Sequence, residues 1–164
     1  MNKTVLLTGG AGYIGSHTAV ELIKAGYKVL VADNLCNSSE ESLIRAGKLC
    51  NAEIGFNRVN VCDAEALDKV FKEHDIDGVI HFAGLKAVGE SVEKPLLYYR
   101  NNIGATVSLL EVMQRNKVRT LIFSSSATVY DTSCAPVYTE ATPLKPCNPY
   151  GWTKFMCEQI IRDV

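Results

Sequence analysis

A glycine-rich turn near the amino terminus sets narrow limits on the fold of this chain. Residues 4–16 read T-V-L-L-T-G-G-A-G-Y-I-G-S, which is an apolar run, a turn and the start of a helical pattern. Gly9 would free the backbone to turn, Gly12 would admit a phosphate close to the main chain, and Gly15 would let the helix pack on the strand. The helix N-terminus favours an anion, so the turn predicts a pyrophosphate site, although an ordinary strand-to-helix turn also fits three glycines.

Length and composition favour a single domain over residues 1–164. The sequence is 47% hydrophobic and carries a formal net charge of −1, which offers no general attraction for nucleic acid. No apolar run reaches the roughly 18 residues that cross a bilayer, and the amino terminus is a strand pattern rather than a signal peptide. We therefore expect a cytoplasmic protein that binds neither nucleic acid nor a membrane.

The cysteines and histidines show no metal-binding pattern. No Cys-x-x-C pair or zinc spacing is present, so we predict buried or half-buried free thiols and no metal site. The three histidines, His17, His74 and His81, are expected to be packing or surface residues. The six cysteines are Cys36, Cys50, Cys62, Cys134, Cys147 and Cys157.

Strand and helix patterns alternate along the chain. This alternation predicts an α/β fold, a Rossmann-like doubly wound parallel sheet in strand order of about 3-2-1-4-5 with helices on both faces. After the first strand, further strands are expected at 27–32, 56–61, 77–82 and 120–124. Helices are expected at about 12–25, from Ser38 or Ser39 to 50, after Asp63, at about 94–116 and from about 149, with the residues between 82 and 94 in a loop.

Three residues mark helix ends in this pattern. Gly26 is placed to end the first helix in a left-handed conformation. Ser38 or Ser39 is a candidate N-cap of the second helix, and Asp63 is the candidate N-cap of the third.

An acidic residue follows the second predicted strand. Asp33 lies eighteen positions past Gly15, where a dinucleotide fold places the acid that binds the adenosine ribose. A carboxylate there would repel a 2′-phosphate, which favours NAD over NADP. An ordinary loop acid is the alternative.

The catalytic candidates are Ser126, Tyr150 and Lys154. Tyr150 and Lys154 lie one turn apart on the last predicted helix, and an ammonium beside a phenol favours the phenolate, which can act as a base. Ser126 follows the fifth strand. The carboxyl end of that strand lies at the same edge of the predicted sheet as the glycine turn and the stretch Phe82-Ala83-Gly84. A Tyr–Lys pair at this spacing is also common on the surface of helices. The hypothesis of a catalytic site therefore rests on the occurrence of all these motifs together and in this order.

By these motifs the chain resembles the extended short-chain dehydrogenase/reductase family, and within it the UDP-glucose 4-epimerases. The resemblance covers essentially all 164 residues and is carried by T-G-G-A-G-Y-I-G-S-H, V-A-D-N-L-C-N-S, H-F-A-G-L-K-A-V-G-E-S, Y-Y-R-N-N, S-S-S-A-T-V-Y and N-P-Y-G-W-T-K. It implies NAD as cofactor and a reversible interconversion of UDP-glucose and UDP-galactose, part of galactose metabolism, through a 4-keto sugar.

The resemblance also implies individual roles. Tyr150 would be the base, Lys154 would bind the nicotinamide ribose, and Ser126 would steady the proton path. The implied cofactor-binding residues are Gly9, Gly12, Tyr13, Ile14, Gly15, Asp33, Asn34, Asn37, Ser38, Asn60, Val61, Phe82, Ala83, Gly84, Lys86, Asn101, Ser124, Tyr150 and Lys154.

Other members of the family remain as alternatives. A nucleotide-sugar dehydratase of the same family needs an acid/base pair after the strand-five serine, where this chain has Ala127 and Thr128. Three positions depart from the epimerase pattern, which usually has Asp, Gly and Gly where this chain has Asn60, Ala105 and Asp131. We expect these departures to cause small local adjustments.

Members of the resembling family run to about twice this length. The resemblance therefore implies a substrate-binding lobe outside these 164 residues, and we expect little epimerase activity from them alone. A second hypothesis is a non-catalytic module that binds NAD or associates with a second copy. In the resembling family, helices equivalent to about 94–116 and 149–164 form a dimer, so a homodimer is expected.

Overall fold

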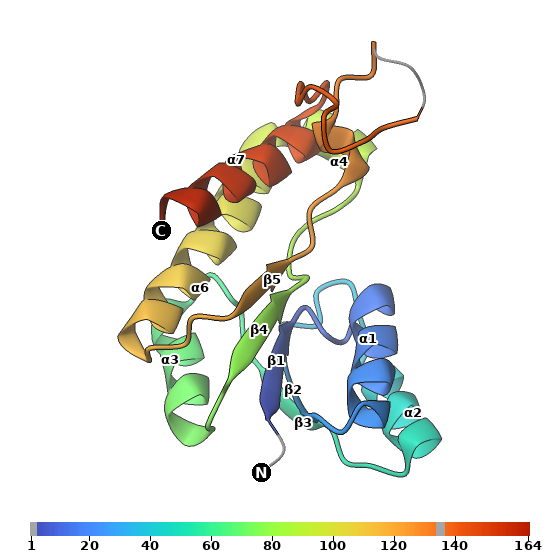
Figure 1. Cartoon of the computed structure of the whole chain (residues 1–164), viewed down its shortest axis with the longest axis vertical. Helices are drawn as coiled ribbons and strands as arrows, with labels where there is room; N and C mark the ends of the chain where they lie inside the picture. Colours follow the sequence, from blue (N-terminus) through green and yellow to red (C-terminus); the bar gives the residue numbers. More distant parts are fainter. Residues whose placement is uncertain (1–2, 134–136) are drawn as a thin grey trace. The chain divides into compact units, whose positions relative to one another are not determined.

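The computed structural model describes residues 3–133 and 137–164 (Figure 1). They form two compact units, which are described separately. The first unit is Met1–Ala83 with Ser108–Ser124, and the second is Gly84–Val107 with Ser125–Val164. The assignment of residues 1–164 to one NAD-binding domain stays a prediction.

The first unit contains a five-stranded parallel sheet. Its order is β3-β2-β1-β4-β5, which confirms the predicted fold class and strand order. In the pairing register, Leu7 of β1 lies opposite Val31 of β2 and Ile80 of β4. The strands are β1 (Thr4–Thr8), β2 (Lys28–Asp33), β3 (Gly55–Arg58), β4 (Gly78–His81) and β5 (Leu121–Phe123).

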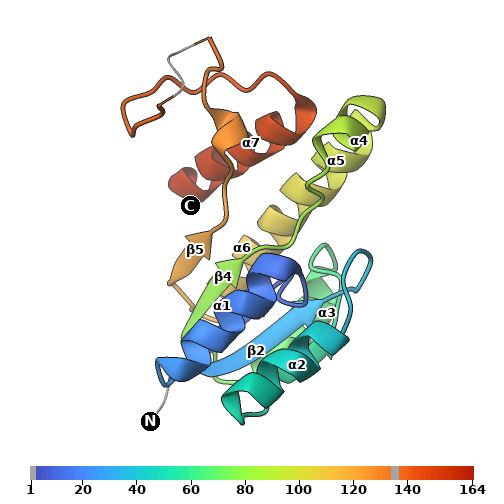
Figure 2. The same cartoon turned by 90° about the vertical axis from the view of Figure 1, so that its right-hand side faces the viewer.

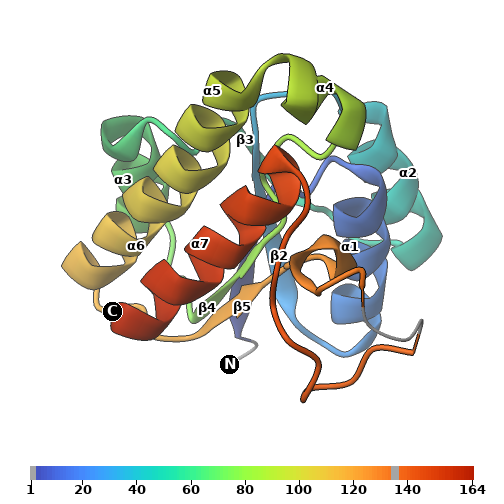
Figure 3. The same cartoon turned by 90° about the horizontal axis from the view of Figure 1, so that it is seen from above.

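Helices cover both faces of this sheet. On one face, α1 (Tyr13–Lys24) and α2 (Glu41–Cys50) lie side by side (Figure 2). The other face carries α3 (Ala64–Glu73) and the part of α6 (Gly104–Arg115) that begins at Ser108 (Figure 3). Side chains alternate along a strand, and Leu7 and Val31 accordingly belong to the core cluster that includes Ala19 of α1 and Leu43 of α2.

The helix ends follow the local sequence signals with one exception. Gly26 has φ +88° after α1, and the Asp63 carboxylate accepts a hydrogen bond from the Ala66 N–H at 3.0 Å, as predicted. The predicted serine cap of α2 is wrong, because Glu40 occupies the N-cap position. Ser39 still accepts a 3.3 Å hydrogen bond from the Glu41 N–H, one position early.

The second unit is helical. It contains α4 (Val88–Glu93), α5 (Pro95–Tyr98), the π-helical turn η1 (Tyr99–Ile103), the first residues of α6, the 3-10 turn η2 (Ala127–Val129) and α7 (Pro149–Asp163). The expected loop between 82 and 94 is thus partly wrong, since it contains α4. The helix expected at about 94–116 is present as α5, η1 and α6.

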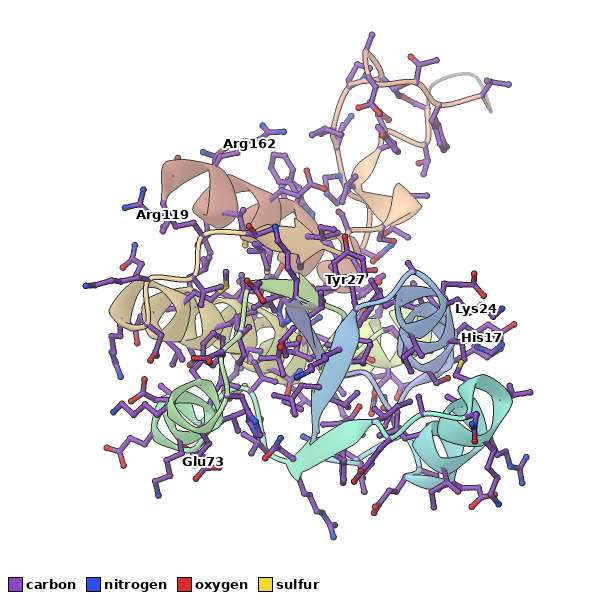
Figure 4. All side chains as sticks on the ribbon, turned by 60° about the horizontal axis from the view of Figure 1, so that its bottom comes forward. His17, Lys24, Tyr27, Glu73, Arg119 and Arg162 are labelled. Carbon is purple, nitrogen blue, oxygen red and sulfur yellow. The ribbon has the colours of Figure 1, made fainter. Side chains whose placement is uncertain are left out.

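The histidines lie as expected, whereas two cysteines do not. His81 is buried and within 2.6 Å of the Thr8 hydroxyl, and His17 projects from the outer side of α1 (Figure 4). Cys36 and Cys147 are exposed free thiols, which contradicts the prediction of buried or half-buried positions. Cys134 lies outside the described residues.

In residues 3–133 and 137–164, no helix combines the length and the apolar character required to cross a membrane.

Candidate active site

Gly9 brings the glycine turn against the end of β4. Its φ is +70°, and a Cβ atom added there would lie 2.6 Å from the backbone nitrogen of Ala83 and 2.9 Å from the carbonyl carbon of Phe82. Any side chain would therefore collide with backbone as well as strain its own dihedrals. The positive φ and the close approach to Phe82 and Ala83 explain why the turn requires glycine at position 9.

The start of α1 is open to an anion. Gly12 occupies the N-cap position, and no side chain caps the helix there. The next two residues, Tyr13 and Ile14, are 74% and 56% exposed although both are apolar. Gly15 is buried, and a Cβ added to it would lie 2.6 Å from the Cα of Gly10. Open N–H groups at a helix N-terminus suit a phosphate, so the turn fits the predicted pyrophosphate.

The Asp33 carboxylate accepts three hydrogen bonds from within the chain. Its Oδ2 accepts a hydrogen bond from the Ala11 N–H at 3.0 Å, and its Oδ1 accepts from the Leu35 N–H at 2.8 Å and the Ser38 hydroxyl at 3.0 Å. A carboxylate offers about four acceptor positions. These three bonds leave one position for a ribose hydroxyl, on the oxygen that also holds the glycine turn.

The remaining adenosine candidates surround two strand ends. After β2, Asn34 accepts a bond from the Cys36 N–H at 3.0 Å, while Asn37 is exposed. After β3, the exposed Asn60 accepts a bond from the Cys62 N–H at 3.1 Å, and Val61 is buried. Because β3 ends at Arg58, the expected strand over 56–61 is wrong at its end and Asn60 lies in a turn.

The other cofactor candidates are divided between the two units. Ser124 extends the β5 side of the sheet through its N–H, which donates to the His81 carbonyl at 3.1 Å. In the second unit, Gly84 lies close to Asn102, and Lys86 is exposed. The assignment of these residues to NAD stays a prediction.

The catalytic candidates of the second unit lie where α7 begins. Asn148 caps the helix by accepting the Gly151 N–H at 2.8 Å, and the Tyr150 N–H donates to the buried Ser91 hydroxyl at 3.2 Å. A Cβ added to Gly151 would lie 2.6 Å from the Thr128 carbonyl oxygen, so the helix packs tightly on η2. Ser91 was not predicted as a site residue, although it is the last residue of the motif H-F-A-G-L-K-A-V-G-E-S.

Ser126 begins η2. Its hydroxyl oxygen accepts hydrogen bonds from the Thr128 N–H at 3.2 Å and the Thr128 hydroxyl at 2.9 Å. With the oxygen accepting both bonds, the Ser126 hydrogen can be directed at a substrate oxygen. Close packing of Gly151 on Thr128 joins this turn to the helix that carries Tyr150.

Lys154 is 5% exposed, one turn beyond Tyr150. Burial lowers the pKa of its ammonium, and the nearby Cys157 opposes this effect. Burial also raises the pKa of the Cys157 thiol. An ionisable group whose pKa is shifted by burial is typical of functional sites.

The lowered pKa predicts how stability depends on pH. Just below the ordinary lysine value of about 10.4, the unfolded chain binds more protons at Lys154 than the folded chain, so the contribution of Lys154 to stability rises with pH in that window. Urea unfolding between pH 7 and 10 is expected to show a less steep rise for Lys154→Met than for the unchanged chain. Parallel curves for the two proteins would contradict this expectation.

Asn102, like Ser91, is a residue of this region that was not predicted from the sequence. It is 3% exposed, and its side chain accepts from the Leu85 N–H at 2.8 Å and donates to the Leu85 carbonyl and the Thr153 hydroxyl, each at 3.0 Å. Thr153 in turn donates to the Tyr150 carbonyl at 2.7 Å. The neighbouring Asn101, which had been selected, donates to Asn102 at 3.0 Å.

A signal for Asn102 was present in the sequence. Tyr98, Asn102 and Thr106 recur every four residues, and Tyr98 and Thr106 are 0% and 1% exposed. Residues at that spacing share one face of a helix. Of the two neighbours Asn101 and Asn102, the spacing therefore indicates Asn102 as the buried one, and it could have been predicted as a site residue.

Asp131 and Ala105 are two of the positions at which the sequence departs from the pattern of the resembling family, and that these departures cause small local adjustments stays a prediction. Asp131 accepts hydrogen bonds from the Ser133 N–H at 2.9 Å and its hydroxyl at 2.7 Å, and these bonds lower the pKa of its carboxyl. Ala105 is buried, with a 3% exposed surface.

Comparison with known proteins gives consistent matches. The model of the NAD dependent epimerase/dehydratase family matches residues 5–164. UDP-glucose 4-epimerase 2 of Arabidopsis thaliana is 55% identical over 100% of this chain and 48% of its own length. UDP-glucose 4-epimerase of Bacillus subtilis (strain 168) is 53% identical over 98% of this chain and 47% of its own length.

A solved structure agrees with both. UDP-glucose 4-epimerase from Bifidobacterium longum in complex with NAD+ and UDP has a TM-score of 0.96 and 49% identity over 98% of this chain and 48% of that chain. The chain spans about half the length of the curated relatives that it matches. Because the family model covers nearly every residue, the chain belongs to the NAD dependent epimerase/dehydratase family.

Proposed function

We propose that this chain is the NAD-binding part of a UDP-glucose 4-epimerase, which interconverts UDP-glucose and UDP-galactose. The observation that carries the proposal is the burial of Lys154 one turn beyond Tyr150, in a chain whose relatives with 55% and 53% identity are UDP-glucose 4-epimerases. Residues 1–164 would supply the cofactor-binding and acid/base groups. UDP-sugar contacts beyond them would come from the remaining half of the relatives' length.

The residues of the first unit fit NAD. The uncapped start of α1 would bind the pyrophosphate, and the free acceptor position of Asp33 would bind an adenosine ribose hydroxyl. NAD bound by these residues would supply reversible hydride transfer to the site.

Proton transfer would fall to the second unit. Tyr150 would take the proton of the sugar 4-hydroxyl and give it back, and Lys154 would bind the nicotinamide ribose. Ser126 would donate a hydrogen bond to the same sugar oxygen. Dehydration is disfavoured at this site because Ala127 has no ionisable group and the Thr128 hydroxyl is bonded to Ser126.

Cofactor preference tests the proposal directly. The chain is expected to bind NAD at least about tenfold more tightly than NADP, because the Asp33 carboxylate repels a 2′-phosphate. Calorimetric titration of both cofactors should show this ratio, and Asp33→Asn should reduce it. Equal affinity for the two cofactors, or no binding of either, would count against the proposal.

We further propose that the protein acts in the cytoplasm as a homodimer. Exposed large apolar side chains on the helices predicted to form the dimer, within 94–116 and 149–164, support a second copy as the partner. These side chains are Leu96, Leu97, Val107, Trp152 and Met156, which are 37–77% exposed. Sedimentation of the chain over a wide concentration range checks the dimer, and a strict monomer would remove it.

A further inference from the structure

Ala11 lies at the centre of the glycine turn, and its backbone N–H and C=O are both bound by side chains from other elements. Its N–H donates to Asp33 Oδ2 at 3.0 Å, and its carbonyl accepts from the Ser42 hydroxyl at 2.7 Å. Ala11 is 2% exposed, so water can hardly replace Ser42 as the hydrogen-bond donor to its carbonyl. Ser42 comes from the first turn of α2, outside the glycine motif.

The carbonyl of Ala11 and the N–H of Gly12 belong to one planar trans peptide, so they point in opposite directions. The Gly12 N–H is directed at the Gly9 carbonyl at 3.2 Å. Gly12 has no Cβ atom to restrict its backbone dihedrals, so the hydrogen bonds of this peptide are needed to fix its orientation. A rotated peptide would break the hydrogen bond from Gly12 to Gly9 and bring the Ala11 oxygen against the Gly9 carbonyl oxygen, which would disrupt the glycine turn.

We propose that Ser42 is a positioning residue for the pyrophosphate site, because its hydroxyl holds the Ala11–Gly12 peptide in the orientation in which the Gly12 N–H closes the glycine turn on the Gly9 carbonyl. The inference rests on the proposed binding of NAD and adds a residue to it. The Ser42 hydroxyl also lies 2.8 Å from the Ser39 carbonyl, and its single hydrogen serves the shorter contact to Ala11.

Two ligands separate phosphate binding from adenosine binding. ADP carries the phosphates, whereas adenosine carries only the base and the ribose. Titration of the 164-residue chain, followed by NMR, should show that Ser42→Ala weakens ADP binding about fivefold to tenfold and changes adenosine binding less than about twofold. Ser42→Thr keeps the hydroxyl and should restore ADP binding.

Ser39→Ala is the matched control. Ser39 stands in the same segment and contacts the Glu41 N–H with its side chain, so its loss should leave the affinity for ADP unchanged. Circular dichroism verifies that each variant is folded. If Ser42→Ala does not fold, Ser42→Cys retains the volume with a weaker donor and should show the same selective loss of ADP affinity.

The outcomes distinguish this inference from the proposed function. Failure of the unchanged chain to bind NAD or ADP would overturn the proposed function and, with it, the inference. Normal ADP binding by the folded Ser42→Ala or Ser42→Cys chain would overturn the role of Ser42 alone. Equal losses for ADP and adenosine would also overturn it, because they would show a general effect on the fold.

Discussion

Replacing Gly9 with alanine is expected to lower the free energy of unfolding by about 3 kcal/mol and to abolish NAD binding. The added Cβ would lie 2.6 Å from the Ala83 nitrogen at a φ of +70°, so backbone must move at the point where β1 meets the end of β4. Urea unfolding followed by circular dichroism measures the first effect. Calorimetric titration with NAD measures the second.

Gly26 provides the matched control. It also has a positive φ, +88°, but an added Cβ would meet no atom within 4 Å. Gly26→Ala should therefore cost only the backbone strain, about 1 kcal/mol, and retain NAD binding. If the two alanine variants are equally stable, close approach to Ala83 does not explain the glycine at position 9.

Replacing Tyr150 with phenylalanine is expected to lower the rate of UDP-galactose conversion by about a thousandfold. Phenylalanine keeps the ring and removes the hydroxyl that would exchange the proton. The contacts made by its backbone, to Ser91 and Thr153, do not depend on that hydroxyl. The assay requires a polypeptide that includes this chain and converts UDP-galactose, with NAD affinity measured in parallel and expected to change less than about twofold.

Tyr138→Phe is a suitable comparison for this experiment. Tyr138 stacks on Tyr130 at a ring-centroid distance of 5.2 Å, and phenylalanine can keep that contact. The Tyr138→Phe variant should convert UDP-galactose at the rate of the unchanged protein. Retention of more than a tenth of the rate by Tyr150→Phe would contradict the assignment of the base, and so would loss of NAD binding together with the rate.

The fold could be predicted well because its signals are local. Apolar runs predicted each strand of the sheet, and Gly26 and Asp63 act at helix ends as single residues do in isolated helices. The short α4 and the π-helical η1 were missed. A π-turn depends on how the helix packs, because its hydrogen-bond pattern has no distinct residue preference.

The candidate site was predicted only in part. Residues with characteristic chemistry could be named, such as Asp33 and Lys154, but the residues that hold them could not. The Ser42 hydroxyl contacts a carbonyl 31 positions away, and the Tyr150 N–H contacts a hydroxyl 59 positions away. No periodicity in the chain links such partners.

For the glycine turn, the sequence by itself determined that a strand, a tight turn and a helix follow one another, because each depends on neighbouring residues. Only the tertiary structure decided why Gly9 has no room for a side chain, since the obstructing atoms belong to Phe82 and Ala83. It also decided that Asp33 and Ser42 hold the two polar groups of Ala11. Contacts between distant segments form when the strands and helices pack, and local propensity does not encode them.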